Sequence, residues 1–336
     1  MNIYAKDGWL DMANIIKQPY PFIVIVGARG IGKTYSSLKY AYESETPFIL
    51  MRTTEKEVKL CSNEAGNPFK SLNRDMGWNV SIEKINDFMY GIYKEKGSSY
   101  IGLTMALTNF SRVRGLDLTD IKLILYDEFI PEKIVKKING IGEAILQAYE
   151  TVSRNRELKG EEPLKLVMMA NALNLNNEVL IHFGIPSMLN KMRKKGLEVM
   201  QDDRRGILLI NPHNSPISEA KQNTALYRIN QRFNEMALDN KFRDFYENNI
   251  SSRNIKNFIP IVRFDNMYFL KSKTSRDIYV STFAPSGYKI EAFENTDFEK
   301  KQFIKKYSVY IQKYFSNHIL FENAELELAF INLFNI

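Results

Sequence analysis

The stretch GARGIGKT at residues 27–34 constrains the fold of this chain more than any other feature. It matches the phosphate-binding loop pattern, in which two glycines five positions apart are followed by lysine and a hydroxyl residue. Such a loop leaves a strand and enters the N-terminus of a helix, where backbone N–H groups and the helix dipole favour phosphate. The apolar run PFIVIV at 21–26 predicts the strand, and YSSLKYAYES at 35–44 has helical character.

Other apolar runs predict the rest of a sheet. They are PFILMRT (47–53), YIGLTMAL (100–107), IKLILYDE (121–128) and LKLVMMAN (164–171). Helical segments lie between several of them, and strands that alternate with helices indicate a parallel, doubly wound α/β sheet. We therefore expect a P-loop ATPase domain over residues 1–210.

The character of the sequence changes after residue 210. The turn-forming stretch NPHNSP (211–216) begins a linker that we place at 211–240 and expect to be largely helical. Residues 258–283 are typical of a β-hairpin around KSKTSRD, and an amphipathic helical stretch and a closing strand and helix follow. We assign residues 241–336 to a smaller C-terminal α/β domain.

Composition narrows the class of protein. A chain of 336 residues with 44% apolar and 12% aromatic residues is ordered and long enough for two domains. The single cysteine, Cys61, excludes an internal disulfide and suits a reducing cytoplasm. No signal peptide and no apolar run near the ~18 residues of a membrane span is evident. The net charge of +7 favours a polyanionic partner.

The loop predicts a site for ATP and Mg²⁺. Lys33 is expected to reach the β- and γ-phosphates, and the Thr34 hydroxyl is expected to bind Mg²⁺. The glycines let the backbone approach the phosphates closely. The nucleotide-binding residues are thus Gly27, Ala28, Arg29, Gly30, Ile31, Gly32, Lys33 and Thr34.

Polar residues at the ends of two predicted strands complete the chemistry. Asp127 is expected to hold the Mg²⁺ shell, and Glu128 to orient and polarise an attacking water. An adjacent Asp–Glu pair favours hydrolysis over phosphorylation of a small molecule, although Glu128 could instead be a solvated or capping acid. Asn171 is a candidate γ-phosphate sensor that links hydrolysis to motion, or merely a cap of the next turn.

Arginines and lysines suggest a neighbouring subunit and a nucleic acid. Arg154 or Arg156 is a candidate arginine finger inserted into the neighbour's site, where such a residue contributes about 10³–10⁵ in rate. Basic segments can follow a phosphate backbone without reading bases, yet each could equally be a solvated face. The DNA-binding candidates are Lys56 and Lys59, beside Arg52, and Arg112 and Arg114, with further clusters at 191–196 and 202–206.

With these residues in place, the chain resembles the DNA-packaging ATPases of tailed phages, and in particular the encapsidation ATPases of small podophages with protein-primed genomes. In the wider terminase family an arginine stands four residues before the loop lysine, and Arg29 occupies that position. The resemblance rests on GARGIGKTY, LILYDEFIP, RNR, VMMANALN, ALDNKF and ILFENAELELAF, which span most of the chain.

The resemblance implies an additional-strand catalytic-glutamate ATPase domain, a short linker and a ribonuclease-H-like C-terminal domain. It implies a homo-oligomeric ring, commonly a pentamer, that docks transiently at the portal of an empty capsid in the host cytoplasm. This ring drives double-stranded DNA inward using ATP. Arg29 then resembles a contact to the phosphates or a relay to the DNA-gripping elements. Whether a structural packaging RNA takes part stays open.

We expect no nuclease activity, because no convincing two-metal carboxylate cluster emerges from Asp239, Asp244, Asp265, Asp277 and Asp297. Two alternatives to a packaging motor remain. One is another nucleic-acid motor, such as a helicase or helicase loader. The other is a nucleotide-dependent portal or ring assembly protein that does not translocate DNA.

Overall fold

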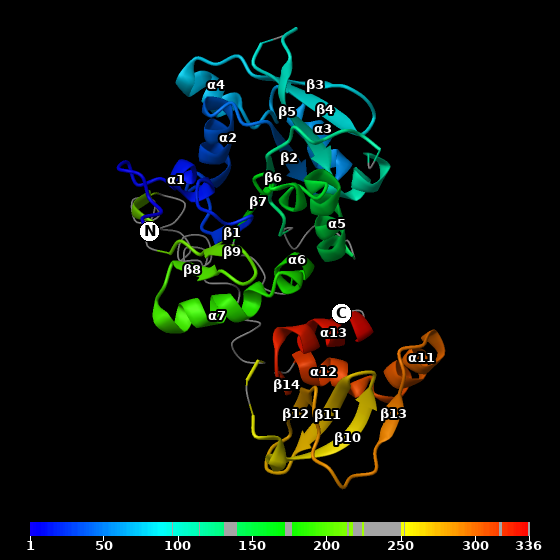
Figure 1. Cartoon of the computed structure of the whole chain (residues 1–336). Helices are drawn as coiled ribbons and strands as arrows, with labels where there is room; N and C mark the ends of the chain where they lie inside the picture. Colours follow the sequence, from blue (N-terminus) through cyan, green and yellow to red (C-terminus); the bar gives the residue numbers. More distant parts are fainter. Residues whose placement is uncertain are drawn as a thin grey trace. The chain divides into compact units, whose positions relative to one another are not determined.

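The structure is a computed structural model of the whole chain. It describes residues 1–95, 97–113, 115–130, 140–171, 177–213, 215–217, 224, 250, 251, 253–315 and 318–334. The chain divides into two compact units, Met1–Phe242 and Arg243–Ile336 (Figure 1). None of the described helices combines the length and the apolar character that crossing a membrane requires.

The N-terminal unit is built on one sheet with the strand order β3-β4-β5-β2-β6-β7-β1-β9-β8 among the described residues. All neighbours from β5 to β9 pair in parallel, while β3–β4, β4–β5 and β8–β9 are antiparallel. The predicted parallel α/β sheet is therefore confirmed. The strands are β1 (Phe22–Gly27), β2 (Phe48–Arg52), β3 (Ser81–Lys84), β4 (Met89–Tyr93), β5 (Tyr100–Ala106), β6 (Leu123–Asp127), β7 (Lys165–Asn171), β8 (Val199–Asp202) and β9 (Ile207–Ile210).

Helices cover this sheet on both faces. The helices are α1 (Met12–Ile16), α2 (Lys33–Glu43), α3 (Glu55–Cys61), α4 (Lys70–Met76), η1 (Leu107–Val113), α5 (Ile141–Ser153), η2 (Glu157–Lys159), α6 (Glu178–His182) and α7 (Ile185–Lys195). The connections β1–α2–β2 and β6–α5–β7 run in opposite directions along the sheet, so right-handed crossovers place α2 and α5 on opposite faces, as Figure 1 shows.

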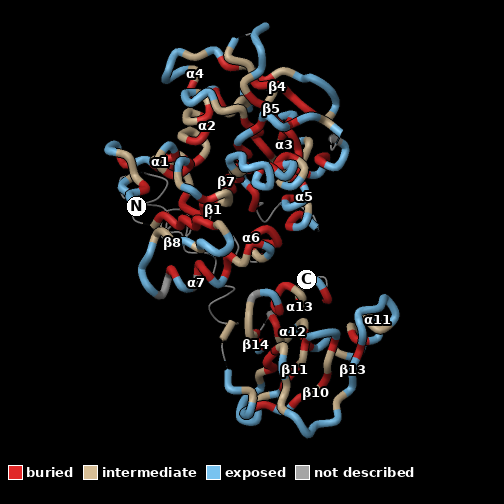
Figure 2. Tube along the Cα trace, in the orientation of Figure 1, coloured by how far each residue is buried: buried red, intermediate tan, exposed pale blue. Residues whose placement is uncertain are grey.

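Burial explains why the predicted strands form the centre. Ile23, Val24 and Ile25 of β1 are fully buried, and so are Leu125 and Tyr126 of β6. Apolar residues on both sides of a strand require helices on both faces of the sheet. In Figure 2 the central strands are accordingly drawn as buried.

The C-terminal unit holds a second sheet with the order β13-β10-β11-β12-β14 among the described residues. β10, β11 and β12 form an antiparallel meander, and β13 and β14 join it in parallel at opposite edges. The predicted hairpin region thus contains three strands. The elements are η3 (Ile255–Asn257), β10 (Phe258–Phe264), β11 (Met267–Ser272), β12 (Ile278–Ser281), β13 (Glu291–Phe293), α11 (Asp297–Lys306), α12 (Val309–Phe315), β14 (Ile319–Phe321) and α13 (Ala324–Phe334).

An aromatic core holds this second unit together. The Phe303 ring lies 5.0 Å from Phe264, 5.3 Å from Phe269 and 5.4 Å from Phe293, which ties α11 to the sheet. Phe330 of α13 lies 5.4 Å from Phe321 of β14. Aromatic pairs at such spacings stabilise a core beyond the area they bury.

Some sequence predictions fall outside the described residues. They include Arg114, Asp239, Asp244 and most of the linker predicted at 211–240. The domain boundaries at 210 and 240 therefore remain predictions.

Candidate active site

The predicted site residues from three strands meet at one edge of the sheet. Gly27 at the end of β1 pairs with Asn171 at the end of β7, and Asp127 at the end of β6 pairs with Met169 of β7. Because the strands are parallel, their carboxyl ends and the polar residues there lie together. A cavity of about 950 Å³ opens at this edge, and Asp127, Glu128 and Asn171 are among its lining residues.

Lys33 is the first residue of α2, directly after the loop glycine Gly32, and is buried. Its Nζ donates hydrogen bonds to the carbonyl oxygens of Gly27 at 3.2 Å and Ala28 at 2.6 Å, and to Oδ1 of Asn171 at 3.1 Å. In this structure the ammonium group of Lys33 therefore binds loop carbonyl oxygens. It would have to break these hydrogen bonds in order to bind a phosphate. The predicted sensor residue, Asn171, is thus in direct contact with the lysine that is predicted to bind phosphate.

Thr34 and Asp127 form a pair of oxygen ligands. The Thr34 hydroxyl donates to Oδ2 of Asp127 at 2.9 Å, and Asp127 is almost fully buried. A hydroxyl and a carboxylate fit Mg²⁺, which prefers hard oxygen ligands. The two side chains are thus close enough to share one ion.

Glu128 follows Asp127 with an unusual backbone conformation. Its φ is +56°, which is rare outside glycine and marks a position that the surrounding structure imposes. Its backbone N–H donates to Oδ1 of Asp127 at 3.1 Å, and its side chain is 64% exposed beside the cavity. The carboxylate can therefore reach solvent, as a residue that activates water must.

Arg52 joins the two carboxylates. One guanidinium nitrogen lies 3.0 Å from Oδ2 of Asp127, and the other lies 2.7 Å from Oε2 of Glu128. Burial disfavours the charged form of Arg52, but the two carboxylates outweigh it and raise the pKa of the guanidinium. The sequence had grouped Arg52 with a basic surface segment, whereas the structure places it inside the site.

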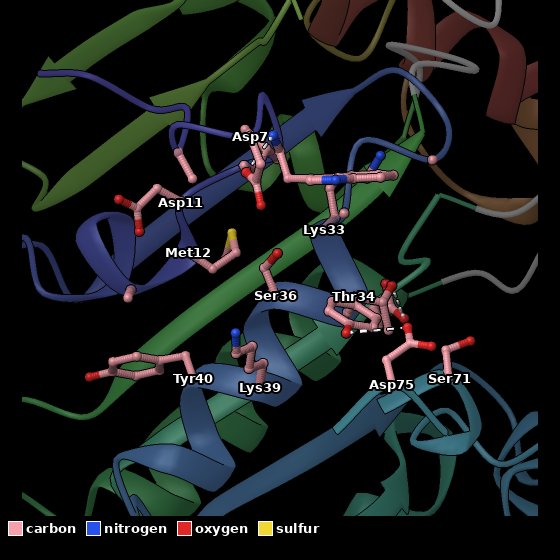
Figure 3. A pocket seen from close by; sticks show the side chains of 18 of the residues that line it. Asp7, Asp11, Met12, Lys33, Thr34, Ser36, Lys39, Tyr40, Ser71 and Asp75 are labelled. Atoms are coloured by element: carbon pink, nitrogen blue, oxygen red, sulfur yellow. Dashed lines mark hydrogen bonds between the residues drawn. The ribbon is translucent and has the colours of Figure 1, made fainter. Parts of the chain in front are cut away.

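The N-terminal segment forms a wall that no motif had indicated. The backbone N–H of Leu10 donates to the carbonyl oxygen of Ile31 at 3.1 Å, which binds the segment to the loop. The Trp9 ring lies against Gly32, whose φ of +89° already favours glycine. Figure 3 shows Asp7, Asp11 and Met12 on this side of the cavity.

Helix α4 provides the opposite wall. Ser71, Arg74 and Asp75 line the cavity, and the Tyr35 hydroxyl donates to Oδ2 of Asp75 at 3.4 Å (Figure 3). Arg29 lies in the loop and also lines the cavity, half-buried. Its predicted position near the phosphates is thus compatible with the structure.

The two finger candidates differ sharply. Arg154 ends α5 with a φ of +44°, and its side chain, 39% exposed, donates to the carbonyl oxygen of Leu116 at 2.6 Å. Arg156 is only 5% exposed, and its guanidinium donates to the carbonyl oxygen of Thr119. Neither residue lines the cavity of its own chain. Both arginines thus contact the loop at residues 116–119, but Arg154 is the more exposed of the two and is therefore the more accessible to another subunit.

The DNA-binding candidates lie on α3 and η1. Lys56 is exposed, and Lys59 makes an ion pair with Glu55 at 2.6 Å within the helix. Arg112 is exposed and its guanidinium lies 5.2 Å from the Phe88 ring centre. These side chains remain at the surface, where contact with a phosphate backbone is geometrically open to them.

A family model of known proteins matches most of this chain. The family model of the podovirus DNA encapsidation protein (Gp16) matches residues 9–329. The chain belongs to this family. The resemblance stated from the motifs is thereby confirmed, and phage DNA packaging is the function of the family. None of the curated proteins compared with the chain matches it.

Solved structures of phage packaging motors show the same fold. The phi-28 gp11 DNA-packaging motor matches with a TM-score of 0.65 at 16% identity, covering 99% of each chain. The bacteriophage phi29 genome-packaging motor assembly matches with the same score, identity and coverage. At this identity the likeness concerns the fold, and it extends over both units of the chain.

Proposed function

We propose that this protein hydrolyses ATP and uses the free energy to translocate double-stranded viral DNA into a preformed capsid. The observation that carries the proposal is the Thr34–Asp127 pair at 2.9 Å, directly beside the exposed carboxylate of Glu128. Two oxygen ligands that could hold Mg²⁺, next to a carboxylate that reaches solvent, form an arrangement suited to hydrolysis. Family membership supplies the purpose of the energy.

In this proposal each residue has one role. Lys33 exchanges the carbonyls of Gly27 and Ala28 for the β- and γ-phosphate oxygens. Thr34 and Asp127 hold Mg²⁺, which neutralises charge on the phosphates when it is bound. Glu128 accepts a hydrogen bond from the attacking water and orients it.

Two further residues tie this chemistry to DNA. Asn171, which accepts a hydrogen bond from Lys33, would respond to the γ-phosphate. Arg52 holds Glu128 at 2.7 Å, and a carboxylate in this ion pair is a poorer hydrogen-bond acceptor for water. If Arg52 releases Glu128 only when DNA binds, ATP hydrolysis would occur only while the protein is bound to DNA.

The N-terminal wall is proposed to hold the base and ribose. Trp9 offers an aromatic face at the cavity, and its contact with Gly32 fixes it beside the phosphate loop. Stacking on an aromatic ring tolerates any purine. We therefore expect Trp9 to raise the affinity for the nucleotide without selecting one purine base over another.

The assembly is proposed to be a homo-oligomeric ring, expected to be pentameric, at the procapsid portal in the host cytoplasm. Arg154 would complete the neighbour's site, and Lys56, Lys59 and Arg112 would contact the DNA backbone. We assign the C-terminal unit as ribonuclease-H-like without nuclease activity. Among the residues that the structure describes, no three or more His, Cys, Asp or Glu side chains are grouped so that they could hold a metal ion, and Asp239 and Asp244 lie outside those residues.

The test is ATP hydrolysis by the full chain, with and without double-stranded DNA, in the wild type and in Glu128→Gln. The proposal expects DNA to stimulate the wild type and the variant to bind ATP without hydrolysing it. If the protein were an assembly protein that needs only bound nucleotide, capsids would fill with the wild type and with Glu128→Gln alike. Capsid filling by Glu128→Gln would therefore favour the assembly alternative.

A further inference from the structure

The residues that follow β9 lie against the phosphate loop. We call residues 211–213 and 215–217 the exit segment, because the chain leads from here to the C-terminal unit. β9 pairs in parallel with β1 up to Ile25 and Ile210, so Pro212 continues the register beside Gly27. A Cβ on Gly27 would lie 2.7 Å from Cγ of Pro212. Since the φ of Gly27 is not left-handed, the proline ring rather than the backbone conformation requires glycine here.

The exit segment also contacts the N-terminal wall of the cavity. A Cβ on Gly8 would lie 3.0 Å from Cβ of Pro216. One carboxylate oxygen of Glu198 accepts hydrogen bonds from the Tyr4 hydroxyl at 2.7 Å and from the backbone N–H of His213 at 2.8 Å. The segment thus touches two parts of the nucleotide site.

Two buried polar atoms show that this arrangement of the segment is not fully satisfied. Oδ1 of Asn211 and Oγ of Ser215 find no hydrogen-bond partner in the described part of the chain, although the residues are only 5% and 1% exposed. Buried oxygen atoms without partners cost free energy, and such groups are rare in native structures. A second arrangement in which either atom gains a partner would recover that free energy.

A phosphate at the loop would disturb the segment at one defined point. Lys33 now binds the carbonyl oxygen of Gly27, the residue on which Pro212 rests. When Lys33 turns to a phosphate, it releases this carbonyl, and the Gly27 backbone keeps its strand pairing with Asn171 but loses the side-chain contact that also holds it. The Pro212 ring occupies the space that a Cβ on Gly27 would need, so it is packed closely enough to respond to a shift of that backbone.

We infer that the exit segment is a nucleotide-responsive strap: occupation of the phosphate loop by a nucleoside triphosphate shifts residues 211–213 and 215–217 through the Gly27–Pro212 contact. The strap carries the state of the site into the chain that leads to the C-terminal unit. This inference rests on the proposed function, because it takes a triphosphate as the ligand. Asn211 and Pro212 are positioning residues, since they act through the loop.

Hydrogen exchange of the full chain tests the strap, with the probe being the non-hydrolysable ATP analogue AMP-PNP and Mg²⁺. Two amides report directly, because the backbone N–H of Asn211 donates to the Glu198 carbonyl and that of His213 to the Glu198 carboxylate. In the wild type, AMP-PNP is expected to protect residues 27–34 and to change exchange at 207–217. Protection at 27–34 with unchanged exchange at 207–217 would overturn the strap and leave the proposed function standing. No change in either region would contradict both.

Variants separate the contact from general stability. Pro212→Ala is expected to retain protection at 27–34 and to lose the response at 207–217. DNA stimulation of its ATP hydrolysis should fall about fivefold or more, the usual size of coupling between sites. Pro163→Ala, in the turn before β7 at the other end of the sheet, is the matched control and should behave as the wild type. A wild-type response and wild-type DNA stimulation in Pro212→Ala would refute the role of the contact.

Discussion

The substitution Arg52→Lys tests whether the ion pair with Glu128 restrains hydrolysis. The Arg52 side chain is 13% exposed and bridges a buried carboxylate, Asp127 at 4%, and an exposed one, Glu128 at 64%. A single ammonium group cannot reproduce the two-armed geometry of a guanidinium. An unpaired buried carboxylate costs more free energy than an unpaired exposed one. We therefore expect the introduced ammonium group to stay with Asp127 and to release Glu128.

The magnitude follows from these exposures. An ion pair with a largely exposed partner contributes about 0.2–1 kcal/mol, which corresponds to roughly 1.4- to fivefold in the population of free Glu128. We expect ATP hydrolysis without DNA to rise within that range, while the rate with saturating DNA stays the same. Complete removal of the guanidinium is less informative, because leaving Asp127 unpaired costs about 3–5 kcal/mol.

The assay is steady-state ATP hydrolysis at saturating Mg²⁺ and ATP, with and without double-stranded DNA. The matched control is Lys84→Met, which removes an exposed ion pair with Asp87 at 2.7 Å on β3, away from the site. This control should hydrolyse ATP as the wild type does. A basal rate of Arg52→Lys at or below that of the wild type, with an unchanged Tm, would refute the restraint.

Three further substitutions probe separate parts of the chain. Glu128→Gln is expected to lower hydrolysis by about 10²–10⁴ with unchanged ATP affinity, measured by single-turnover kinetics; comparable rates would remove Glu128 from the chemistry. Arg156→Ala, which loses a buried charged hydrogen bond, should lower Tm by roughly 3–12 °C in a thermal melt, whereas a pure finger role predicts an unchanged Tm. Burial would raise the pKa of Asp277, but hydrogen bonds from His318 and Ser275 outweigh it and lower that pKa. Its stabilisation is thus complete above the unfolded pKa of about 4 and is lost as pH falls through the lower folded value, so Asp277→Asn should flatten the acid decline of Tm; an identical decline would contradict this.

Local motifs located the residues that meet at one edge of the sheet, while their catalytic roles stay predictions. The loop, the Asp127–Glu128 pair and Asn171 each follow an apolar strand, and parallel strands bring their carboxyl ends together. The order of strands and helices along the sequence was therefore enough to predict that these residues lie close together. Arg52 was not, because its contact with Glu128 depends on the register between β2 and β6, where Met51 pairs with Tyr126. No local pattern encodes that register.

Other parts of the site depend on contacts between distant segments. The N-terminal wall is placed by the hydrogen bond between Leu10 and Ile31, and the exit segment by the ring of Pro212. β9 consists of only four apolar residues, too few to separate from a loop by periodicity. Arg156 is buried after a turn in which Arg154 and Asn155 both have positive φ. A positive φ is uncommon for arginine, so no sequence pattern indicated this turn.

The central claim is that hydrolysis at this site moves DNA. It is tested most directly by protection of DNA from nuclease in procapsids, with ATP, for the wild type and for Glu128→Gln. The account predicts protected DNA with the wild type and none with the variant, although both bind ATP. Full protection with Glu128→Gln, or ATP hydrolysis by the wild type that does not respond to DNA, would contradict it.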